Sequence, residues 1–177
     1  TAGDRVFSAD LLVGADGVDG VDMNGDPAPN EGAAYVFNPG MPGNAGVRVS
    51  PIGLSGGDGF GFSVAVADDT FPNFGIVGAP FDDGIADDDA DCGAAYLVNL
   101  PTGGSGVTFR ADDQFRGDLY GYSVSMSWPR AAIGAPFVGS GADGSVYLHV
   151  SPFDDDGDGV SFPNLEINSP TGQFGEQ

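Results

Sequence analysis

The feature that most constrains the fold of this chain is an internal repeat. The stretch "GFGFSVAVADDTFPNFGIVGAP" at residues 59–80 returns in shortened form as "YGYSVSMSWPRAAIGAP" at residues 120–136. Both copies have an aromatic residue followed by glycine at or next to their start, and both close with Gly-Ala-Pro. Markers that recur in the same order at a period of about sixty residues indicate stacked copies of one supersecondary unit.

Two other markers keep the same order along the chain. Gly-Ala occurs in "LLVGAD", "GIVGAP" and "AAIGAP", and a Gly-x-x-Tyr box follows each of them in "GAAYVF", "GAAYLV" and "GSVYLH". The aromatic-Gly pair occurs at residues 60–61, 120–121 and 174–175. We therefore expect one repeat region, with blades near 1–55, 56–112 and 113–169 and the start of a further blade at 170–177. The first of these blades lacks its opening aromatic-Gly strand.

Each unit is predicted to fold as four short antiparallel strands. In the second unit they are expected in "FGFSVAVA", "FGIVGAP", "GAAYLVNL" and "GVTFRA". Apolar residues recur at a period of two, and glycine or proline interrupts every window in which a helix could form. Small four-stranded sheets repeated along a chain are typical of β-propellers. The prediction is an all-β protein of about three propeller-like blades, forming an open or partial propeller.

The charge of the chain limits its partners. There are 26 acidic residues against five arginines, no lysine, and a net charge of −21. Phosphate groups would be repelled, so neither nucleic acid nor an anionic membrane surface is expected as a partner. No apolar run approaches the roughly 18 residues of a membrane span, so direct membrane insertion is not expected either. Two interpretations of the acidity stay open: adaptation to salt in a halophilic or marine source, or calcium binding.

These residues resemble the FG-GAP repeat family, which is named after the aromatic-Gly and Gly-Ala-Pro boxes seen here. The family includes the β-propeller of integrin α-subunits and many secreted proteins. The loop "GADGVDGVDMNGDPAPNEGAAYVF" is similar to the long-loop subtype of bacterial surface proteins. The resemblance implies a non-enzymatic structural or adhesive protein that is secreted or displayed on a cell surface.

The family's usual calcium loop cannot be carried over to this chain. In integrin-like members, a D-x-D/N-x-D-G loop lies between the first and second strands. The matching stretches here are "VADDTFPNFG", with acids only at Asp68 and Asp69, and "SMSWPRAA", with no acid. If calcium is bound, other loops must hold it.

The best metal candidate is "DDDGDG", where alternating carboxylates precede a glycine that permits a sharp turn. The twelfth position of an EF-hand-like loop would fall on Leu165 instead of an acid, with Glu166 one residue later, so a solvated acidic turn is the alternative. The calcium candidates are Asp154, Asp156 and Asp158, then Asp22, Asn24 and Asp26, and in a second tier Asp83, Asp87, Asp89 and Asp91.

Other motifs suggest extracellular ligands. "RGD" at Arg116, Gly117 and Asp118 matches an integrin-binding tripeptide, although chance and the repeat pattern also explain it. Trp128, Tyr120 and Tyr122 are candidate platforms for sugars, as expected if the protein were a carbohydrate-binding propeller. The single histidine, His149, lies on a predicted strand, and no nucleophile or phosphate-binding motif occurs. We therefore expect no enzyme activity.

The two ends of the sequence complement each other. The stretch "QFGEQ" begins a first strand, and "TAGDRVFSADLLVGA" continues a unit that lacks one. The chain could be a fragment of a larger propeller, or it could close on itself, which is disfavoured because propellers have roughly four to eight blades. Alternatively, the tail of one copy completes the first blade of the next, giving a head-to-tail homopolymer. Self-association into a filament or sheath is thus expected, with carbohydrate binding as the alternative.

Overall fold

The computed structural model describes residues 11–22, 24–37, 46–49, 51–67, 74–84, 91–100, 102–111, 115–138, 144–150 and 165–168. Over these residues the regular structure is entirely β, as the repeat predicts. In this part of the chain there is accordingly no helix long and apolar enough to cross a membrane.

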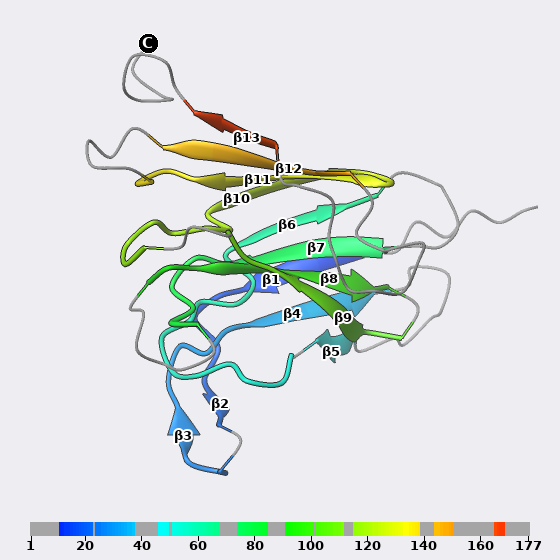
Figure 1. The fold of residues 1–177 in the computed structure, drawn as a ribbon. Helices are drawn as coiled ribbons and strands as arrows, with labels where there is room; N and C mark the ends of the chain where they lie inside the picture. Colours follow the sequence, from blue (N-terminus) through cyan, green and yellow to red (C-terminus); the bar gives the residue numbers. More distant parts are fainter. Residues whose placement is uncertain are drawn as a thin grey trace, which may run out of the picture.

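Three antiparallel sheets follow one another along the chain and lie stacked in chain order, without closing into a ring (Figure 1). Blade 1 contains β1 (Leu11–Ala15), β4 (Ala33–Phe37) and β5 (Val47–Val49). Blade 2 contains β6 (Ser63–Val66), β7 (Phe74–Ala79), β8 (Ala94–Asn99) and β9 (Gly104–Phe109). Blade 3 contains β10 (Ser123–Ser127), β11 (Arg130–Ala135), β12 (Ser145–Val150) and β13 (Leu165–Asn168). The predicted all-β, partial-propeller architecture is confirmed.

The strand register makes the blades equivalent residue by residue. The glycine of each Gly-Ala box lies opposite an apolar residue of the Gly-x-x-Tyr strand: Gly14 opposite Ala34, Gly78 opposite Ala95 and Gly134 opposite Val146. β1, β7 and β11 therefore hold the same position in their sheets. β7 and β11 each pair on both sides, whereas β1 pairs only with β4 among the described residues.

The hydrophobic core is divided into two clusters, one on each side of blade 2. β7 contributes Val77 to the cluster shared with blade 1 and Ile76 to the cluster shared with blade 3. Successive residues of a strand point to opposite faces of the sheet. Blade 2 is covered on both faces, and all six residues of β7 are buried, whereas β1 and β11 alternate between buried and more exposed positions.

A small hairpin that the sequence analysis did not predict projects from blade 1 (Figure 1). It consists of β2 (Gly20–Val21) and β3 (Pro27–Ala28), joined by a turn around Asn24 and Gly25. Asn-Gly is a strong hairpin signal because both residues tolerate positive φ angles, and Gly25 has a φ of 85°.

Candidate functional site

The most regular feature of the molecule is the joint between consecutive blades. Each joint is made by an aromatic-Gly turn, Phe60–Gly61 or Tyr120–Gly121, that lies on the preceding blade. The amide of Phe60 donates to the carbonyl of Glu31 at 2.9 Å, and the amide of Tyr120 donates to the carbonyl of Cys92 at 3.0 Å. Both turns also form an isolated parallel bridge to the glycine that opens the Gly-x-x-Tyr box, Gly32 in one case and Gly93 in the other.

Glycine is required on both sides of this joint. Gly121 has a φ of 90°, and a Cβ there would overlap the carbonyl oxygen of Ala94 on blade 2. On the receiving side, a Cβ at Gly78 would overlap the carbonyl oxygen of Gly121. The same overlaps occur between Gly61 and blade 1, so both joints exclude side chains for the same reason. The Ser63 hydroxyl adds a hydrogen bond to the Gly121 carbonyl at 2.8 Å.

The aspartate before each aromatic-Gly turn closes a tight local loop. The Asp58 carboxylate accepts hydrogen bonds from the Ser55 amide at 2.7 Å and the Ser55 hydroxyl at 2.9 Å. The Asp118 carboxylate accepts the Phe115 amide at 2.7 Å in the same arrangement. Because Asp118 is only 4% exposed, its carboxylate cannot serve an external receptor. The expectation that Arg116–Asp118 acts as an adhesion motif is therefore wrong: the aspartate is a turn-closing residue.

Tyr120 is fully buried, which excludes it as a surface platform for sugars. Its ring lies in the cluster between blades 2 and 3, and its hydroxyl is hydrogen-bonded to His149 Nε2 at 2.6 Å. The expectation of an exposed Tyr120 is wrong because the residue belongs to the blade joint. His149 is also buried and lies 4.6 Å from the Phe109 ring, between ring centroids. Its position fits the structural role expected for it.

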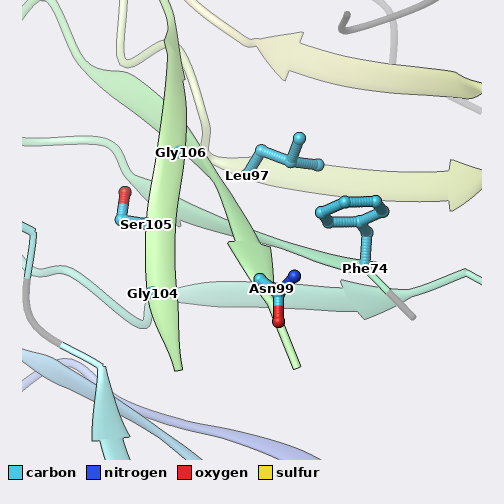
Figure 2. Close-up of a pocket in the computed structure, with 6 residues that line it drawn as sticks. All are labelled: Phe74, Leu97, Asn99, Gly104, Ser105 and Gly106. Carbon is cyan, nitrogen blue, oxygen red and sulfur yellow. The ribbon is translucent and has the colours of Figure 1, made fainter. Parts of the chain in front are cut away.

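Trp128 lies in the turn between β10 and β11 and stacks on Phe74 of blade 2, with ring centroids 4.8 Å apart. One face of the indole is thereby covered by protein. Phe74 also lines a shallow pocket of about 310 Å³ together with Leu97 and Asn99 (Figure 2). Figure 2 shows the opposite wall formed by the backbone of residues 104–106 on β9. Among the described residues that line the pocket, Asn99 and Ser105 carry the polar side chains.

Tyr122 is the one sugar candidate with a substantially exposed ring, and it belongs to an aromatic cluster. Its ring centroid lies 4.9 Å from that of Phe62, which in turn lies 5.8 Å from that of Phe81. Sequence reasoning missed this cluster. The available signal was the aromatic residue that follows two of the three aromatic-Gly pairs, at Phe62 and Tyr122, and the phenylalanine that follows each Gly-Ala-Pro box.

A buried polar network lies within blade 2. The Asp82 carboxylate accepts hydrogen bonds from Tyr96 Oη, from Arg110 Nη2 at 2.8 Å and from the Gly84 amide at 2.9 Å. Burial, followed by the adjacent Asp82 charge, raises the pKa of Tyr96 above its usual value, so the phenol stays protonated. Burial also raises the pKa of Asp58 to about 6, with a smaller contribution from the Asp82 charge. The network fixes the loop that follows the Gly-Ala-Pro box.

The candidate metal ligands fall into two groups. Asp22 is engaged in the β2–β3 turn, where its Oδ1 accepts the amides of Asn24 and Asp26, both at 2.8 Å. The Asn24 side chain turns its amide nitrogen toward Asp22 Oδ2 at 3.3 Å. The amide of Asp26, and to a lesser extent that of Asn24, lowers the pKa of Asp22. These contacts order the turn, and calcium binding by Asp22, Asn24 and Asp26 stays a prediction.

The remaining acids do not converge in the described part of the chain. Asp83 Oδ1 accepts the amide of Asp91 at 2.8 Å, which again closes a loop. Among the described residues, no three acidic, histidine or cysteine side chains are placed to hold one ion. Five candidates lie outside the described residues: Asp87, Asp89, Asp154, Asp156 and Asp158.

The two outer faces of the stack differ from each other. Each corresponds to one of the two surfaces that meet where consecutive blades pack. On blade 1, Leu11 and Val13 point away from blade 2 and are 55% and 39% exposed. Val13 pairs with Tyr35 in the same way as Val77 pairs with Tyr96. Val13 therefore corresponds to Val77, which blade 1 covers on the surface of blade 2. On blade 3, Gly134 holds the position of Gly78, which receives the next blade. The outer face of blade 3 is therefore of the kind that receives the next blade. The outer face of blade 1 is of the kind that packs onto a preceding blade.

Stacked antiparallel sheets joined by aromatic-Gly turns define a β-propeller-like repeat protein. Residues 107–149, from β9 to β12, match the family model described as FG-GAP repeat. The match confirms the predicted resemblance to the FG-GAP repeat family over this part of the chain. Comparison with the curated proteins gave no match.

Proposed function

We propose that this chain is a non-enzymatic structural module that associates head-to-tail with a second copy of itself. FG-GAP repeat proteins are typically non-enzymatic. The observation that carries the proposal is the difference between the two outer faces. Blade 1 presents the face that a preceding blade covers elsewhere in the stack, and blade 3 presents the face that a following blade covers. Contacts between unlike faces are heterologous and extend into open assemblies unless they close into a ring.

The open edge of β1 supports the same conclusion. β7 and β11 occupy the position of β1 in their own sheets, and each has a strand on both sides. In the described residues, the edge of β1 opposite β4 has no paired strand. An edge of this kind accepts an added strand through backbone hydrogen bonds. A first strand supplied by the preceding copy would complete blade 1 as β6 completes blade 2.

Replacing Val13 by aspartate should prevent this association. The substitution places a charge in the apolar face that would be buried against the next copy, which is costly without a partner charge. In sedimentation velocity, the unmodified chain should show a weight-average mass that rises with concentration, whereas Val13→Asp should remain monomeric over the same range.

The matched control is Val21→Asp. Val21 is also exposed, at 66%, but it lies on the β2–β3 hairpin and not on a strand of a blade. Val21→Asp makes the same change in composition and charge as Val13→Asp, but it should leave the association between copies intact. A monomeric unmodified chain at all concentrations, or equal effects of the two variants, would contradict the proposed assembly.

The proposal includes calcium bound outside the family's usual loop. The alternating carboxylates Asp154, Asp156 and Asp158 are the ligands proposed, on their spacing alone. Calcium at a hundredfold excess over its dissociation constant should stabilise the fold by about 2.7 kcal/mol, which raises the melting temperature by about 5–10 °C for a chain of this size. Differential scanning calorimetry with and without chelator, at fixed ionic strength, measures the shift.

The control for calcium is a variant with all three carboxylates replaced by asparagine. It should lose the calcium response while keeping any general response to sodium chloride, because screening of a net charge of −21 does not depend on one loop. A melting temperature that ignores chelator, or a triple variant that still responds to calcium, would remove calcium from the proposal.

An extracellular location, secreted or at the cell surface, is part of the same proposal. It is supported by the FG-GAP resemblance and by the acidic, lysine-free composition. Carbohydrate binding is not proposed as a second function, because Tyr120 is buried and Trp128 lies on Phe74. Likewise, an adhesive role would rest on the outer faces of the stack, since the carboxylate of Asp118 is buried.

A further inference from the structure

We infer that Asp58, buried beside Asp82 at the joint between blades 1 and 2, is a proton-binding site that stabilises the fold in mild acid. Asp58 lies two residues before Phe60, whose amide donates to blade 1 at the carbonyl of Glu31. Asp82 belongs to the buried polar network of blade 2. The inference concerns contacts within a single copy of the chain, so it does not depend on the proposed self-association.

The loop that follows the Gly-Ala-Pro box brings the two carboxylates together. The Phe81 amide donates to the Asp58 carbonyl at 3.3 Å, which places the next residue, Asp82, beside Asp58. Both aspartates are 2% exposed. The Asp82 carboxylate has the Arg110 guanidinium at 2.8 Å, whereas the Asp58 carboxylate accepts its hydrogen bonds from the neutral Ser55. Among the described residues, one arginine thus serves two buried carboxylates.

The other two blades show that the fold does not need a carboxylate at the position of Asp82. In every blade the carbonyl of this residue accepts the amide of the glycine that opens the Gly-x-x-Tyr box, and the residues are Val18, Asp82 and Val138. The Asp58 turn itself is repeated at Asp118, whose carbonyl accepts the Phe137 amide at 3.4 Å. The residue after Phe137 is the buried, apolar Val138. A second carboxylate beside the turn is therefore particular to blade 2.

The surroundings of Asp58 favour its protonated form. Burial raises the pKa of Asp58 to about 6, and the charges of Asp82 and Asp83 add to the shift. These two acids lie on the loop after β7, and Arg110, which follows β9, is paired with Asp82. The Tyr96 phenol on β8 also contacts Asp82 and stays protonated, because burial raises its pKa further. Asp58 is thus the group that gains a proton in mild acid.

Proton uptake by Asp58 determines the direction of the pH dependence. In an unfolded chain, an aspartate has a pKa of about 3.9. Between about pH 4 and pH 6 the folded chain therefore holds a proton on Asp58 that the unfolded chain has released. Stability falls with rising pH wherever the native state binds more protons. The contribution of Asp58 is consequently least favourable above pH 6 and improves as the pH falls toward 4.

Asp58→Asn tests the inference, because it removes the proton-binding group and keeps the hydrogen bonds of the turn. The asparagine oxygen can accept the Ser55 amide, and its NH2 group can donate to the Ser55 hydroxyl. Urea unfolding of both proteins is measured from pH 7.5 to pH 5.0, at fixed ionic strength and one low protein concentration. The ratio of the unfolding equilibrium constants, unmodified chain over variant, should fall about tenfold across this range.

The control is Asp16→Asn, which makes the same change in net charge at an exposed position of blade 1. The relief of repulsion in a chain of net charge −21 affects all of these proteins and cancels in the ratios. The ratio for Asp16→Asn should therefore not show the tenfold change. Equal pH dependence of stability in the unmodified chain and in Asp58→Asn would overturn the inference.

The proton itself is observed by NMR, through the side-chain carboxyl carbon signal of Asp58 in the folded chain. Its titration should have a midpoint near pH 6, and a midpoint below about pH 4.5 would overturn the inference because the value is then that of an ordinary aspartate. Asp82→Asn removes the neighbouring charge and should move the midpoint of Asp58 to lower pH. An unchanged midpoint would overturn the part of the inference that gives Asp82 a share in binding the proton.

Discussion

Replacing Gly121 by alanine should strongly destabilise the protein. The residue has a φ of 90°, which L-amino acids with a side chain rarely adopt, and the new Cβ would overlap the Ala94 carbonyl of blade 2. Neither obstacle can be relieved without separating blades 2 and 3. The expected loss is about 4 kcal/mol or more, equivalent to a fall of roughly 10 °C in melting temperature for a chain of this size.

Thermal unfolding followed by circular dichroism measures this effect, and Gly106→Ala on β9 is the control. Both variants add one methyl group to a glycine. At Gly106, however, the new Cβ would meet no heavy atom of the described residues beyond its chain neighbours within 4 Å, and the φ angle is not in the positive range. The control should melt within a few degrees of the unmodified chain. If the two variants melt alike, the aromatic-Gly turn does not hold the blades together in the way described above.

Replacing Arg110 by methionine should give the second large loss of stability. Its guanidinium donates to Asp82 at 2.8 Å, and the Asp82 side chain is 3% exposed. Without Arg110, a buried carboxylate keeps only neutral hydrogen-bond donors. Removing one partner of a buried pair costs about 3–5 kcal/mol, and because the Arg110 side chain is itself 21% exposed, we expect the lower end of that range.

The control for this variant is Arg130→Met, which removes the same charge from an exposed position on β11. Chemical denaturation of both variants separates the loss of the ion pair from the general effect of a more negative chain. A double variant, Arg110→Met with Asp82→Asn, should recover part of the lost stability because no buried charge remains. No recovery would mean that Arg110 acts through packing of its aliphatic stem instead of through Asp82.

The repeat made the architecture predictable from sequence. Three motifs mark positions where one backbone comes close to another: aromatic-Gly, Gly-Ala and Gly-x-x-Tyr. The close approach at such glycines leaves no room for a larger residue. Gly78 and Gly121 are examples, since each would place a Cβ against a carbonyl of the neighbouring blade. The order and spacing of these markers therefore identified the strands and the propeller-like class.

The candidate site was less predictable, because exposure depends on what covers a strand from outside its own sequence. Tyr120 and Tyr122 flank the same glycine, yet one is buried in the joint and the other lies at the surface. The sequence suggested that Asp118 is available for binding as part of Arg116–Asp118. In the structure, its carboxylate accepts a hydrogen bond within the turn. The sequence did not distinguish Asp82 from its acidic neighbours as a buried residue. Its partners Tyr96 and Arg110 are distant in the chain.

The unlike outer faces of the stack give any assembly of these chains a direction. One end of a growing polymer would always offer blade 1 with its open β1 edge, and the other would always offer blade 3. The two ends would then present different surfaces to an incoming subunit, since one must accept a strand while the other must deliver it. A short fragment carrying only one of the two faces would stop growth at one end and leave the other free to elongate.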